Sequence, residues 1–546
     1  MGSCKIWDYI LVGGGLSASV VTHRLIESNP KLNILVVEAG PDASDRPDIV
    51  WPNSTNLVGG DFDWAYNTVD QQWLDNRQVD MPAGKALGGG TVINAGGWVR
   101  GDKVDYDLWG SIVDDERWTY EGLLPFMKKS ETFWDKRINP TQHGLKGPVS
   151  IQSVTSTNRE FPLRDHVLRS WGELGLSPLE GLDANAGTPL GIGELQENKK
   201  DGRRQIASSV YPLHGATVVT DTLVEKILLE RKGGKLRAKG IKLANGTDFR
   251  GSNVLLAAGA IRSPQLLMLS GVGPADELAK VGVPVLLDQP AVGKNLSDHG
   301  LFAHLWNVKD PSAGWAIGSG NPLFEQEQYG WGGPMDFLTT TDVCKEGLAA
   351  AIEEDEGVAP DPETHPLLSG PRAFAEHVFM YAGAADGSKV TFILITLLPT
   401  ARGSVKLASA SISDPPLIDP NFLGSAVDRY VAREALKTQL KFATSTEVGR
   451  DILDRELGAP GFDQVFTTNS TDEYIDARLR AGLGTSFHPM GSLAMGSVVD
   501  TDLRVKGVEG LRVIDASVFP VPITGHLQVA VYALAEQAAE IISKGA

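Results

Sequence analysis

The chain has 546 residues, of which 42% are hydrophobic and 22% are charged, a composition typical of globular proteins with two or three domains. Its formal net charge of −18 and the lack of a basic run make nucleic acids and anionic membranes poor partners. The only cysteines, Cys4 and Cys344, exclude a disulfide framework and a thiolate metal site, so we expect no metal.

The first forty residues predict a βαβ unit. A buried strand is expected over residues 8–12, a helix over 19–28 and a second strand over 32–38. The unit begins so early that it leaves no room for a signal peptide, and no apolar run is long enough to span a membrane. We therefore expect a cytoplasmic protein, or a secreted one if a leader has been removed.

The turn of this unit carries the dinucleotide fingerprint Gly-x-Gly-x-x-Ala, formed by Gly13, Gly15 and Ala18. Gly13 allows the tight turn, and Gly15 lets backbone amides approach a pyrophosphate, to which the helix N-terminus adds its partial positive charge. Glu38 ends the second strand, where its carboxylate can accept hydrogen bonds from ribose hydroxyls and would repel a 2′-phosphate. The alternative, a glycine-rich turn that binds nothing, explains less well why a strand, a helix and an acidic residue follow in this order.

A glycine-rich run follows a long irregular connection over residues 45–80. Seven glycines fall among the eighteen residues 84–101, too many for a good helix or strand. Apolar side chains such as Leu87, Val92 and Ile93 are interleaved with them, and a flexible linker would avoid such side chains. We expect the backbone here to pass close to something flat or phosphorylated.

The glycine-rich run and the residues after it contain Gly84-x-x-Leu87-Gly88-Gly89, Asn94, Arg100-Gly101 and Asp105-Tyr106-Asp107-x-Trp109. This pattern resembles the first signature of the glucose–methanol–choline (GMC) oxidoreductases, flavoenzymes that bind FAD through the same kind of N-terminal unit. The family usually has Ser-Ser or Ser-Thr where this chain has Gly90-Thr91. Members with covalent FAD can carry a histidine where this chain has Ile93, so the resemblance implies non-covalent FAD.

The middle of the chain is predicted to alternate helices and strands. Helices are expected over 118–130 and 162–176, and strands over 218–230, 238–243 and 254–258.

Residues 259–273 resemble the second signature of the family at every defined position. Within them, Ser263 and Pro264 are expected to start a helix, because serine caps a helix and proline suits its first turn. A further segment, Val292-Gly293-x-Asn295-Leu296-x-Asp298-His299, is again similar to the family. We expect His299 to be structural rather than catalytic.

Residues 301–400 match the family least and hold many aromatic side chains. Such side chains belong more often to a core, but a cleft lined by a few of them would favour an aromatic or apolar substrate. Strands over 390–398 and 402–407 are expected to form an antiparallel sheet under the substrate site, followed by a helix over 428–445. The aromatic residues are Trp306, Trp315, Phe324, Tyr329, Trp331, Phe337, Phe374, Phe379 and Tyr381.

Two histidines lie in matched contexts near the C-terminus. His488 follows Phe487, and His526 lies 38 residues further on, just before Leu527 and Gln528. A lone histidine is usually structural, whereas two in such contexts are not the usual case. The resemblance implies that His488 and His526 project over the flavin.

The fingerprint and the resemblance together imply which residues contact FAD. In chain order these are Gly13, Gly15, Leu16, Ser17, Glu38, Ala39, Leu87, Gly90, Thr91, Asn94, Ala95, Gly97, Val224, Asp515, Ala516, Gln528 and Val529. Val224 matches the position that meets the adenine, and the last two offer backbone contacts near the flavin ring.

Alcohol oxidation requires the hydroxyl proton and a carbon-bound hydride to leave. A neutral imidazole, with a reference pKa of about 6.5, is suited to take the proton, and the flavin takes the hydride at N5. We assign His488 as the general base and His526 as the hydrogen-bonding partner that orients the alcohol oxygen. Phe487 is expected to shape the substrate pocket.

The resemblance covers nearly the whole chain and implies a mixed α/β fold. A Rossmann-like FAD-binding domain is expected over residues 1–150, 202–299 and 484–546. A substrate domain, built on an antiparallel sheet flanked by helices, is expected over residues 151–201 and 300–483.

The leading interpretation is FAD-dependent oxidation of a small alcohol, primary and aromatic or apolar, to its aldehyde, with oxygen or another acceptor reoxidising the flavin. A non-redox relative, such as a hydroxynitrile lyase or a cyclase, would instead keep FAD structurally. A non-catalytic FAD-stabilised binding protein would not need both histidines, and a nicotinamide dehydrogenase fits the fingerprint but not the two signatures. The alcohol, the electron acceptor and the oligomeric state stay open at this point.

Overall fold

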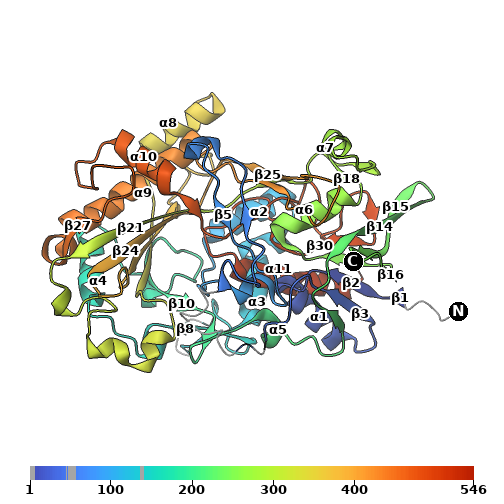
Figure 1. The fold of residues 1–546 in the computed structure, drawn as a ribbon, viewed down its shortest axis with the longest axis horizontal. Coiled ribbons are helices and arrows are strands. Elements are labelled where there is room, and N and C mark those ends of the chain that lie inside the picture. Colours follow the sequence, from blue (N-terminus) through green and yellow to red (C-terminus); the bar gives the residue numbers. More distant parts are fainter. Residues whose placement is uncertain (1–5, 45, 47–56, 136–139, 546) are drawn as a thin grey trace.

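A computed structural model describes residues 6–44, 46, 57–135 and 140–545. Cys4 lies outside these residues, whereas Cys344 is an exposed, free thiol. Helices and strands are mixed along the chain, as the sequence predicts. Figure 1 shows two lobes, one around β2 (Tyr9–Val12) and the other around β21 (Gly300–Val308).

The first lobe is built on a parallel sheet that assembles segments far apart in the sequence. The expected βαβ unit is present, with α1 (Leu16–Ser28) crossing between two neighbouring strands. All neighbouring strands run parallel, as in a Rossmann-like fold. In spatial order the strands are β13 (Thr217–Val219), β3 (Ile34–Val37), β2, β17 (Val254–Leu256) and β30 (Leu511–Val513).

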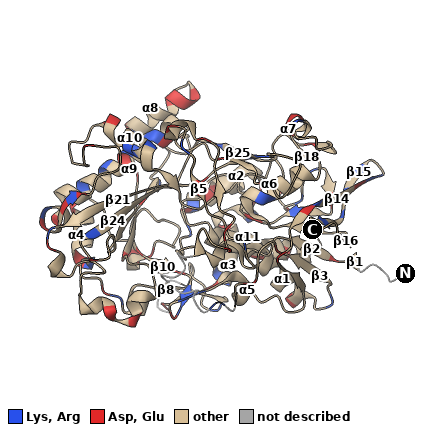
Figure 2. Cartoon of the chain, viewed as in Figure 1, with Lys and Arg blue, Asp and Glu red and all other residues tan. Residues whose placement is uncertain are grey.

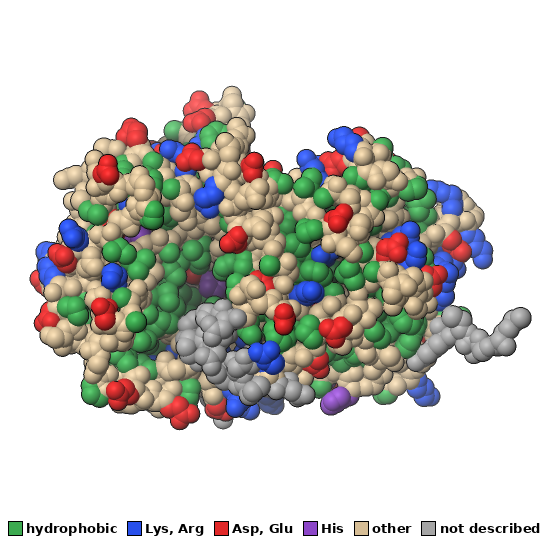
Figure 3. Space-filling model, in the orientation of Figure 1, with side chains coloured by type: hydrophobic (Ala, Val, Ile, Leu, Met, Phe, Trp, Pro, Cys, Tyr) green, Lys and Arg blue, Asp and Glu red, His purple; other side chains and the backbone are tan. Residues whose placement is uncertain are grey.

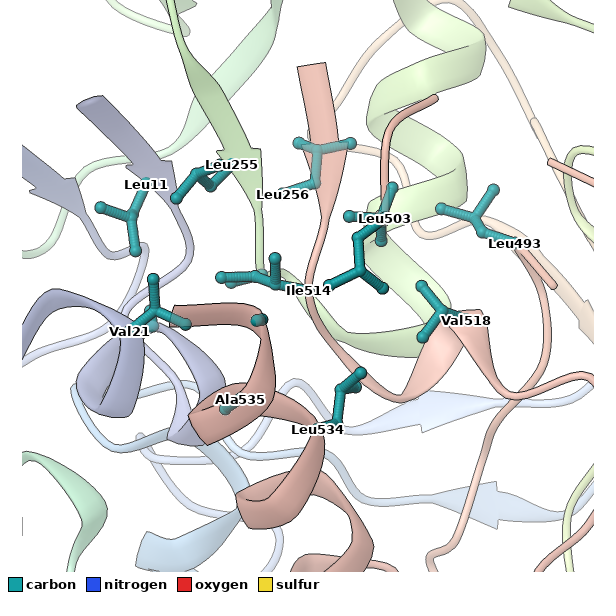
Figure 4. Close-up of a cluster of buried hydrophobic side chains, with 14 of the residues drawn as sticks. Leu11, Val21, Leu255, Leu256, Leu493, Leu503, Ile514, Val518, Leu534 and Ala535 are labelled. Atoms are coloured by element: carbon teal, nitrogen blue, oxygen red, sulfur yellow. The ribbon is translucent and has the colours of Figure 1, made fainter. Parts of the chain in front are cut away.

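A hydrophobic core lies between this sheet and two helices. Figure 4 shows Leu11 and Leu255 from the sheet in one buried cluster with Val21 from α1 and Leu534 from α11 (Gln528–Ser543). These four side chains have no exposed surface. Burial of this kind stabilises the fold by roughly 1.5–3 kcal/mol for each large aliphatic side chain. It fixes the two helices whose N-terminal ends face the candidate site.

A second sheet of this lobe carries the long hairpin β14 (Val224–Lys232) and β15 (Lys235–Leu243). The prediction of one continuous strand over residues 218–230 is wrong, because the chain leaves β13 before β14 begins. Asp221 has a φ of +51° in between, a left-handed conformation that no strand contains. The break moves the chain from the parallel sheet to the hairpin.

The second lobe is built on an antiparallel sheet, against which α9 (Ala426–Ser445) packs. Its neighbouring strands are all antiparallel. In spatial order they are β27 (Leu453–Glu456), β21, β24 (Lys389–Thr396), β23 (Ala375–Met380), β22 (Phe337–Thr341) and β9 (Gly191–Glu194), with β28 (Gly484–Thr485) also beside β21.

The two strands expected on either side of Pro399 belong to different sheets, so the prediction of one shared sheet is wrong. β24 lies in the antiparallel sheet, whereas β25 (Gly403–Lys406) pairs with β20 (Lys294–Leu296) and β26 (Leu417–Asp419). Pro399 cannot donate to a strand ladder, and its carbonyl accepts a hydrogen bond from Arg402 at 2.7 Å. These two features turn the chain out of the first sheet.

Helix α6 (Gly259–Leu269) begins four residues earlier than Ser263, where it was expected to start. The carboxylate of Asp515 accepts hydrogen bonds from the first amide of the helix at 2.9 Å and from Ser263 Oγ at 2.6 Å. Asp515 therefore takes the capping role expected of the serine. Pro264 lies inside the helix and cannot bind the carbonyl four residues before it, which accepts from Ser492 Oγ at 2.5 Å instead.

The other helices surround the two sheets. They are α2 (Lys103–Val113), α3 (Tyr120–Ser130), α4 (Arg164–Glu173), α5 (Ala207–Val210), α7 (Ala275–Lys280), α8 (Lys345–Glu356) and α10 (Asp472–Gly482). Charged residues of both signs are spread over outer elements such as α8 and β15 (Figure 2). Among the described residues, no helix is both long and apolar enough to cross a membrane.

Candidate active site

A cavity of about 780 Å³ lies between the two lobes. Turns at the carboxyl ends of the parallel strands form one side, and the antiparallel sheet forms the other. Figure 3 shows the molecule hollowed between the lobes, with hydrophobic side chains on one wall and a histidine at the base. The position is the one at which open α/β sheets bind ligands.

The turn between β2 and α1 is shaped for close approach. Gly13 has a φ of +93°, and a Cβ atom there would lie 2.5 Å from the carbonyl oxygen of Ala257, so only glycine fits. Gly15 is the N-cap of α1 and has no side-chain cap, and a Cβ on it would meet nothing closer than 3.7 Å. Gly15, Leu16 and Ser17 line the cavity, so the free amides of the first helical turn face a space suited to a pyrophosphate.

The glycine-rich run packs directly on this turn. Gly88 and Gly89 have φ values of +101° and +55°, and a Cβ on Gly89 would lie 2.8 Å from Gly15 Cα. Gly90 lines the cavity, and no atom lies within 4 Å of a Cβ placed on it. The run therefore packs against the fingerprint turn at Gly89, whereas the space beside Gly90 is open.

Glu38 is buried at the cavity wall, with 6% of its surface exposed. Its Oε2 accepts a hydrogen bond from the amide of Gly14 at 2.7 Å, and its Oε1 accepts one from the amide of Gly40 at 2.8 Å. Burial raises the pKa of Glu38 to about 7, although these amides oppose the rise. Each carboxylate oxygen keeps a lone pair for a further donor, such as a ribose hydroxyl.

Two polar side chains of the glycine-rich run have partners within the protein. Thr91 Oγ1 donates to the carbonyl of Gly88 at 2.7 Å and accepts from the amide of Ala207 at 2.9 Å, so the fold uses its hydroxyl. Asn94 Oδ1 accepts a hydrogen bond from Arg204 at 2.6 Å. Arg204 is a buried cation that sequence reasoning did not single out.

Most of the residues expected to contact FAD line this cavity. They are Gly13, Gly15, Leu16, Ser17, Glu38, Ala39, Gly90, Thr91, Asn94, Ala95, Gly97, Val224, Asp515, Ala516 and Gln528. The structure does not bring Leu87 and Val529 to the wall. Leu87 packs behind Gly14, and Val529 points from α11 into the core and is fully buried.

His488 and His526 both line the cavity, with their ring centroids 5.2 Å apart. His488 follows β28, and His526 precedes α11, so the fold brings together two segments that are separate in the sequence. A Cβ on Gly97 would lie 2.4 Å from His526 Nδ1, so the second histidine requires a glycine beneath it. The end of the cavity that is lined by the fingerprint turn is called the dinucleotide end. The two imidazoles lie between this end and the antiparallel sheet.

The backbone around His488 is strained and tightly held. Phe487, which lines the cavity and is 55% exposed, has a φ of +66°. Asp298 accepts hydrogen bonds from the amide of His488 at 2.9 Å and from the hydroxyl of Thr485 at 2.5 Å. Burial raises the pKa of Asp298 to about 7. These bonds hold a conformation that costs about 1–3 kcal/mol, as is common at functional sites.

The pKa values of the two histidines are shifted in opposite directions. Burial lowers the pKa of His488 well below its usual range, and the neighbouring His299 and His526 lower it further. Burial also acts to lower the pKa of His526, but the charge of Glu376 and a hydrogen bond to it at 3.0 Å raise it overall. A neutral imidazole therefore lies beside one that favours its protonated form.

Glu376 is a site residue that sequence reasoning missed. It is 1% exposed, lines the cavity, and has an Oε2 atom without a hydrogen-bond partner among the described residues. It is the second residue of β23, whose other residues are almost all buried. A carboxylate within such a strand is rare unless it is paired, and that pattern was the available signal.

The wall opposite the dinucleotide end is aliphatic. The residues that form it are Leu195, Leu301, Met335, Leu338, Val378, Ile393 and Ile395. The nine aromatic residues named above, all of them described, do not line the cavity, so they do not form the aromatic cleft that was considered as an alternative to a core position. Among the described residues, the aromatic ones that line the cavity are Trp64, Tyr66 and Phe487. Side chains alternate along a strand: Val378 of β23 faces the cavity, and its neighbour Phe379 packs against Phe392 at 5.0 Å between centroids.

The parallel sheet, the fingerprint turn and the cavity at the carboxyl ends of the strands define a dinucleotide-binding fold, and the two histidines lie at its cavity. Residues 7–301 match the N-terminal family model of the GMC oxidoreductases, and residues 399–535 match the C-terminal one. The chain belongs to the GMC oxidoreductase family.

Similar proteins share its length. The chain is 36% identical over 552 residues to GMC-type oxidoreductase acuG of Aspergillus aculeatus, covering 98% of this chain and 99% of that protein. It is 31% identical over 579 residues to pyranose dehydrogenase 3 of Leucoagaricus meleagris, covering 98% and 93%. The crystal structure of pyridoxine 4-oxidase from Mesorbium loti superposes with a TM-score of 0.81 and 28% identity, covering 98% of both chains.

Proposed function

We propose that this protein oxidises an apolar primary alcohol to its aldehyde, with His488 as the general base. His526, charged through Glu376, binds the alcohol oxygen. The observation that carries this proposal is the pair of histidines at one cavity with pKa values shifted in opposite directions. When their environments shift the pKa values of two titratable groups apart, the group with the lowered pKa can act as the base and the other as the hydrogen-bond donor.

FAD fits the residues at the dinucleotide end of the cavity. The amides at the start of α1 would receive the pyrophosphate, Glu38 would accept hydrogen bonds from the ribose hydroxyls, and Gly90 leaves open space at the glycine-rich run. Val224 and Ala516 also line this end. When bound, FAD supplies the acceptor for the hydride that leaves the alcohol carbon.

The residues of the chain itself control the proton. Nδ1 of His488 is within hydrogen-bond distance of Ser486 and His299, whereas its Nε2 makes no hydrogen bond to a described residue and keeps accessible surface. Nε2 is therefore the nitrogen that accepts the hydroxyl proton. A low pKa makes His488 a weaker base, and the positive charge of His526 compensates by stabilising the negative charge that develops on the alcohol oxygen.

The rate of flavin reduction is expected to follow a bell-shaped pH profile. The rate should rise with pH through the ionisation of His488, well below pH 6.5, because only the neutral imidazole accepts a proton. It should fall again above pH 6.5 as His526 loses its proton. Glu376→Gln removes the charge that raises the pKa of His526, so the basic limb should move to lower pH.

Anaerobic stopped-flow measurements across pH test this expectation. Glu194→Gln, on β9 of the same sheet and outside the cavity, serves as the matched control and should leave the basic limb in place. A basic limb that is unchanged in Glu376→Gln would contradict the role given to His526.

Apolar alcohols are expected to be better substrates than glucose. Benzylic, allylic or aliphatic primary alcohols should give a higher kcat/KM, because the substrate wall presents aliphatic side chains. Val378→Thr keeps the shape of one of them and adds a hydroxyl, so it should reduce this preference by up to about tenfold. Steady-state kinetics on both alcohol classes measure the ratio, and a higher kcat/KM for glucose would refute the assignment.

FAD is expected to be held without a covalent bond. Ile93 lines the cavity at the position where covalently flavinylated relatives can carry a histidine, and its side chain offers no nucleophile. Acid precipitation of the purified protein should release all the yellow colour into the supernatant. A yellow pellet after washing would show a covalent link and overturn this expectation.

A further inference from the structure

His299 lies directly behind the proposed base. Its Nδ1 is 3.1 Å from Nδ1 of His488, and the two rings are nearly perpendicular, at 83°. His299 has no exposed surface, and burial lowers its pKa to about 3. It is therefore neutral at ordinary pH and carries a single ring proton.

The backbone holds the two histidines in this register. The segment before β21 runs antiparallel to the segment around His488, with the amide of Ser486 donating to the carbonyl of His299 at 2.9 Å. Ser297 and Met490 exchange two backbone hydrogen bonds, each of 2.9 Å, on the other side. The contact between the rings is thus fixed by main-chain pairing on both sides.

Two facing nitrogens at hydrogen-bond distance need one donor and one acceptor, so the tautomers of the two rings are coupled. The ladder that pairs Gly300 with Thr396 places Leu397 opposite His299, and the carbonyl of Leu397 acts to raise the pKa of His299. Nε2 of His299 has no close hydrogen bond among the described residues. Nε2 of His488 must be unprotonated to accept the alcohol proton, so the single proton of neutral His488 has to lie on its Nδ1, and Nδ1 of His299 then has to be the acceptor of the pair.

We propose that His299 is a positioning residue that keeps the proton of neutral His488 on Nδ1 and so leaves Nε2 free to accept the alcohol proton. The inference rests on the proposed role of His488 as the base. It follows the general pattern in which a third group orients a catalytic base. The hydroxyl of Ser486, 2.9 Å from the same Nδ1, is a second acceptor for that proton.

The test compares two substitutions that affect packing and hydrogen bonding differently. His299→Asn offers an amide oxygen close to the former Nδ1 position, whereas His299→Leu fills the apolar space without an acceptor. In a Ser486→Ala background, His299→Leu is expected to slow anaerobic flavin reduction by roughly 10–100-fold, a size typical of lost partners behind a reacting group. His299→Asn should retain most of the rate, and the dependence of the rate on alcohol concentration should be unchanged in both.

Thermal unfolding of the same holoenzymes separates positioning from structure. If His299 only filled space, the rate of flavin reduction in each variant would follow its thermal stability. His299→Leu would then be as fast as His299→Asn or faster. His304→Gln, a buried histidine of β21 outside the cavity, is the control and should reduce its flavin at the parent rate. Equal rates for His299→Leu and the parent in the Ser486→Ala background would overturn the inference. If His488→Ala reduced its flavin at the parent rate, the assignment of His488 as the base would itself be wrong.

Discussion

Replacing His488 with alanine is expected to slow flavin reduction by ~10²–10⁴-fold while the purified protein keeps its FAD. The hydride leaves readily only as the hydroxyl proton is lost, so the base acts on the slow step. The side chain lies at the histidine pair and not in the fingerprint turn, which explains why FAD binding should survive. Anaerobic stopped-flow absorbance with an excess of alcohol measures the rate.

His526→Asn is the matched comparison for this experiment. Asparagine can still donate a hydrogen bond to the alcohol oxygen, but it cannot carry the charge that Glu376 supports, so the loss should be smaller than for His488→Ala. If His488→Ala reduced its flavin at the parent rate, the assignment of the base would be wrong, and His526 would be the next candidate.

Glu38→Arg is expected to give a folded protein that has lost its FAD. The substitution replaces the acceptor of two buried amides, those of Gly14 and Gly40, with a cation that cannot accept. It also removes the acceptor for the ribose hydroxyls at the wall of the cavity. The ratio of flavin to protein absorbance after purification measures the loss, and a parent-like ratio would contradict the proposed position of FAD.

Glu38→Gln separates the effect on FAD from the effect on folding. Glutamine keeps the shape and one acceptor, so one buried amide loses its partner at a cost of about 1–3 kcal/mol. FAD affinity should fall by roughly tenfold, because only one end of the glutamine side chain can still accept a hydrogen bond from the ribose hydroxyls. Titration of the apoprotein with FAD gives the affinity, and circular dichroism checks that both variants are folded.

The parts of the site that depend on local turn chemistry could be predicted from the sequence. A tight turn with positive φ requires glycine wherever it occurs, so Gly13 marks the fingerprint turn. The position of Glu38 at the site could be predicted from the length of one βαβ unit, and that of Gly90 from the glycine-rich run. The family resemblance added the two histidines, which composition and periodicity alone would not have paired.

The parts that depend on contacts between distant strands could not be predicted. Glu376 reaches His526 only because β23 lies across the cavity from the start of α11. The face of a strand that a residue occupies also depends on the sheet it joins, which is why Phe379 enters the core and Val378 the cavity. The domain boundaries stay a prediction.

Errors in strand prediction have similarly specific causes. A positive φ at Asp221 breaks an apolar run that reads as one strand. Pro399 and Arg402 redirect the chain between two strands that read as neighbours. Helix α6 is capped by Asp515, a residue from a distant segment of the chain, so the helix begins before Ser263.

The most direct test of this account is the anaerobic addition of a panel of benzylic, aliphatic and sugar alcohols to the FAD-loaded protein, followed by its visible absorbance. We expect the band of oxidised flavin to disappear with an apolar primary alcohol and the aldehyde to form in equal amount. Readmitting air then reports whether oxygen restores the band. A flavin that stays oxidised with every alcohol, as expected of a lyase or cyclase that keeps FAD structurally, would contradict the proposed function.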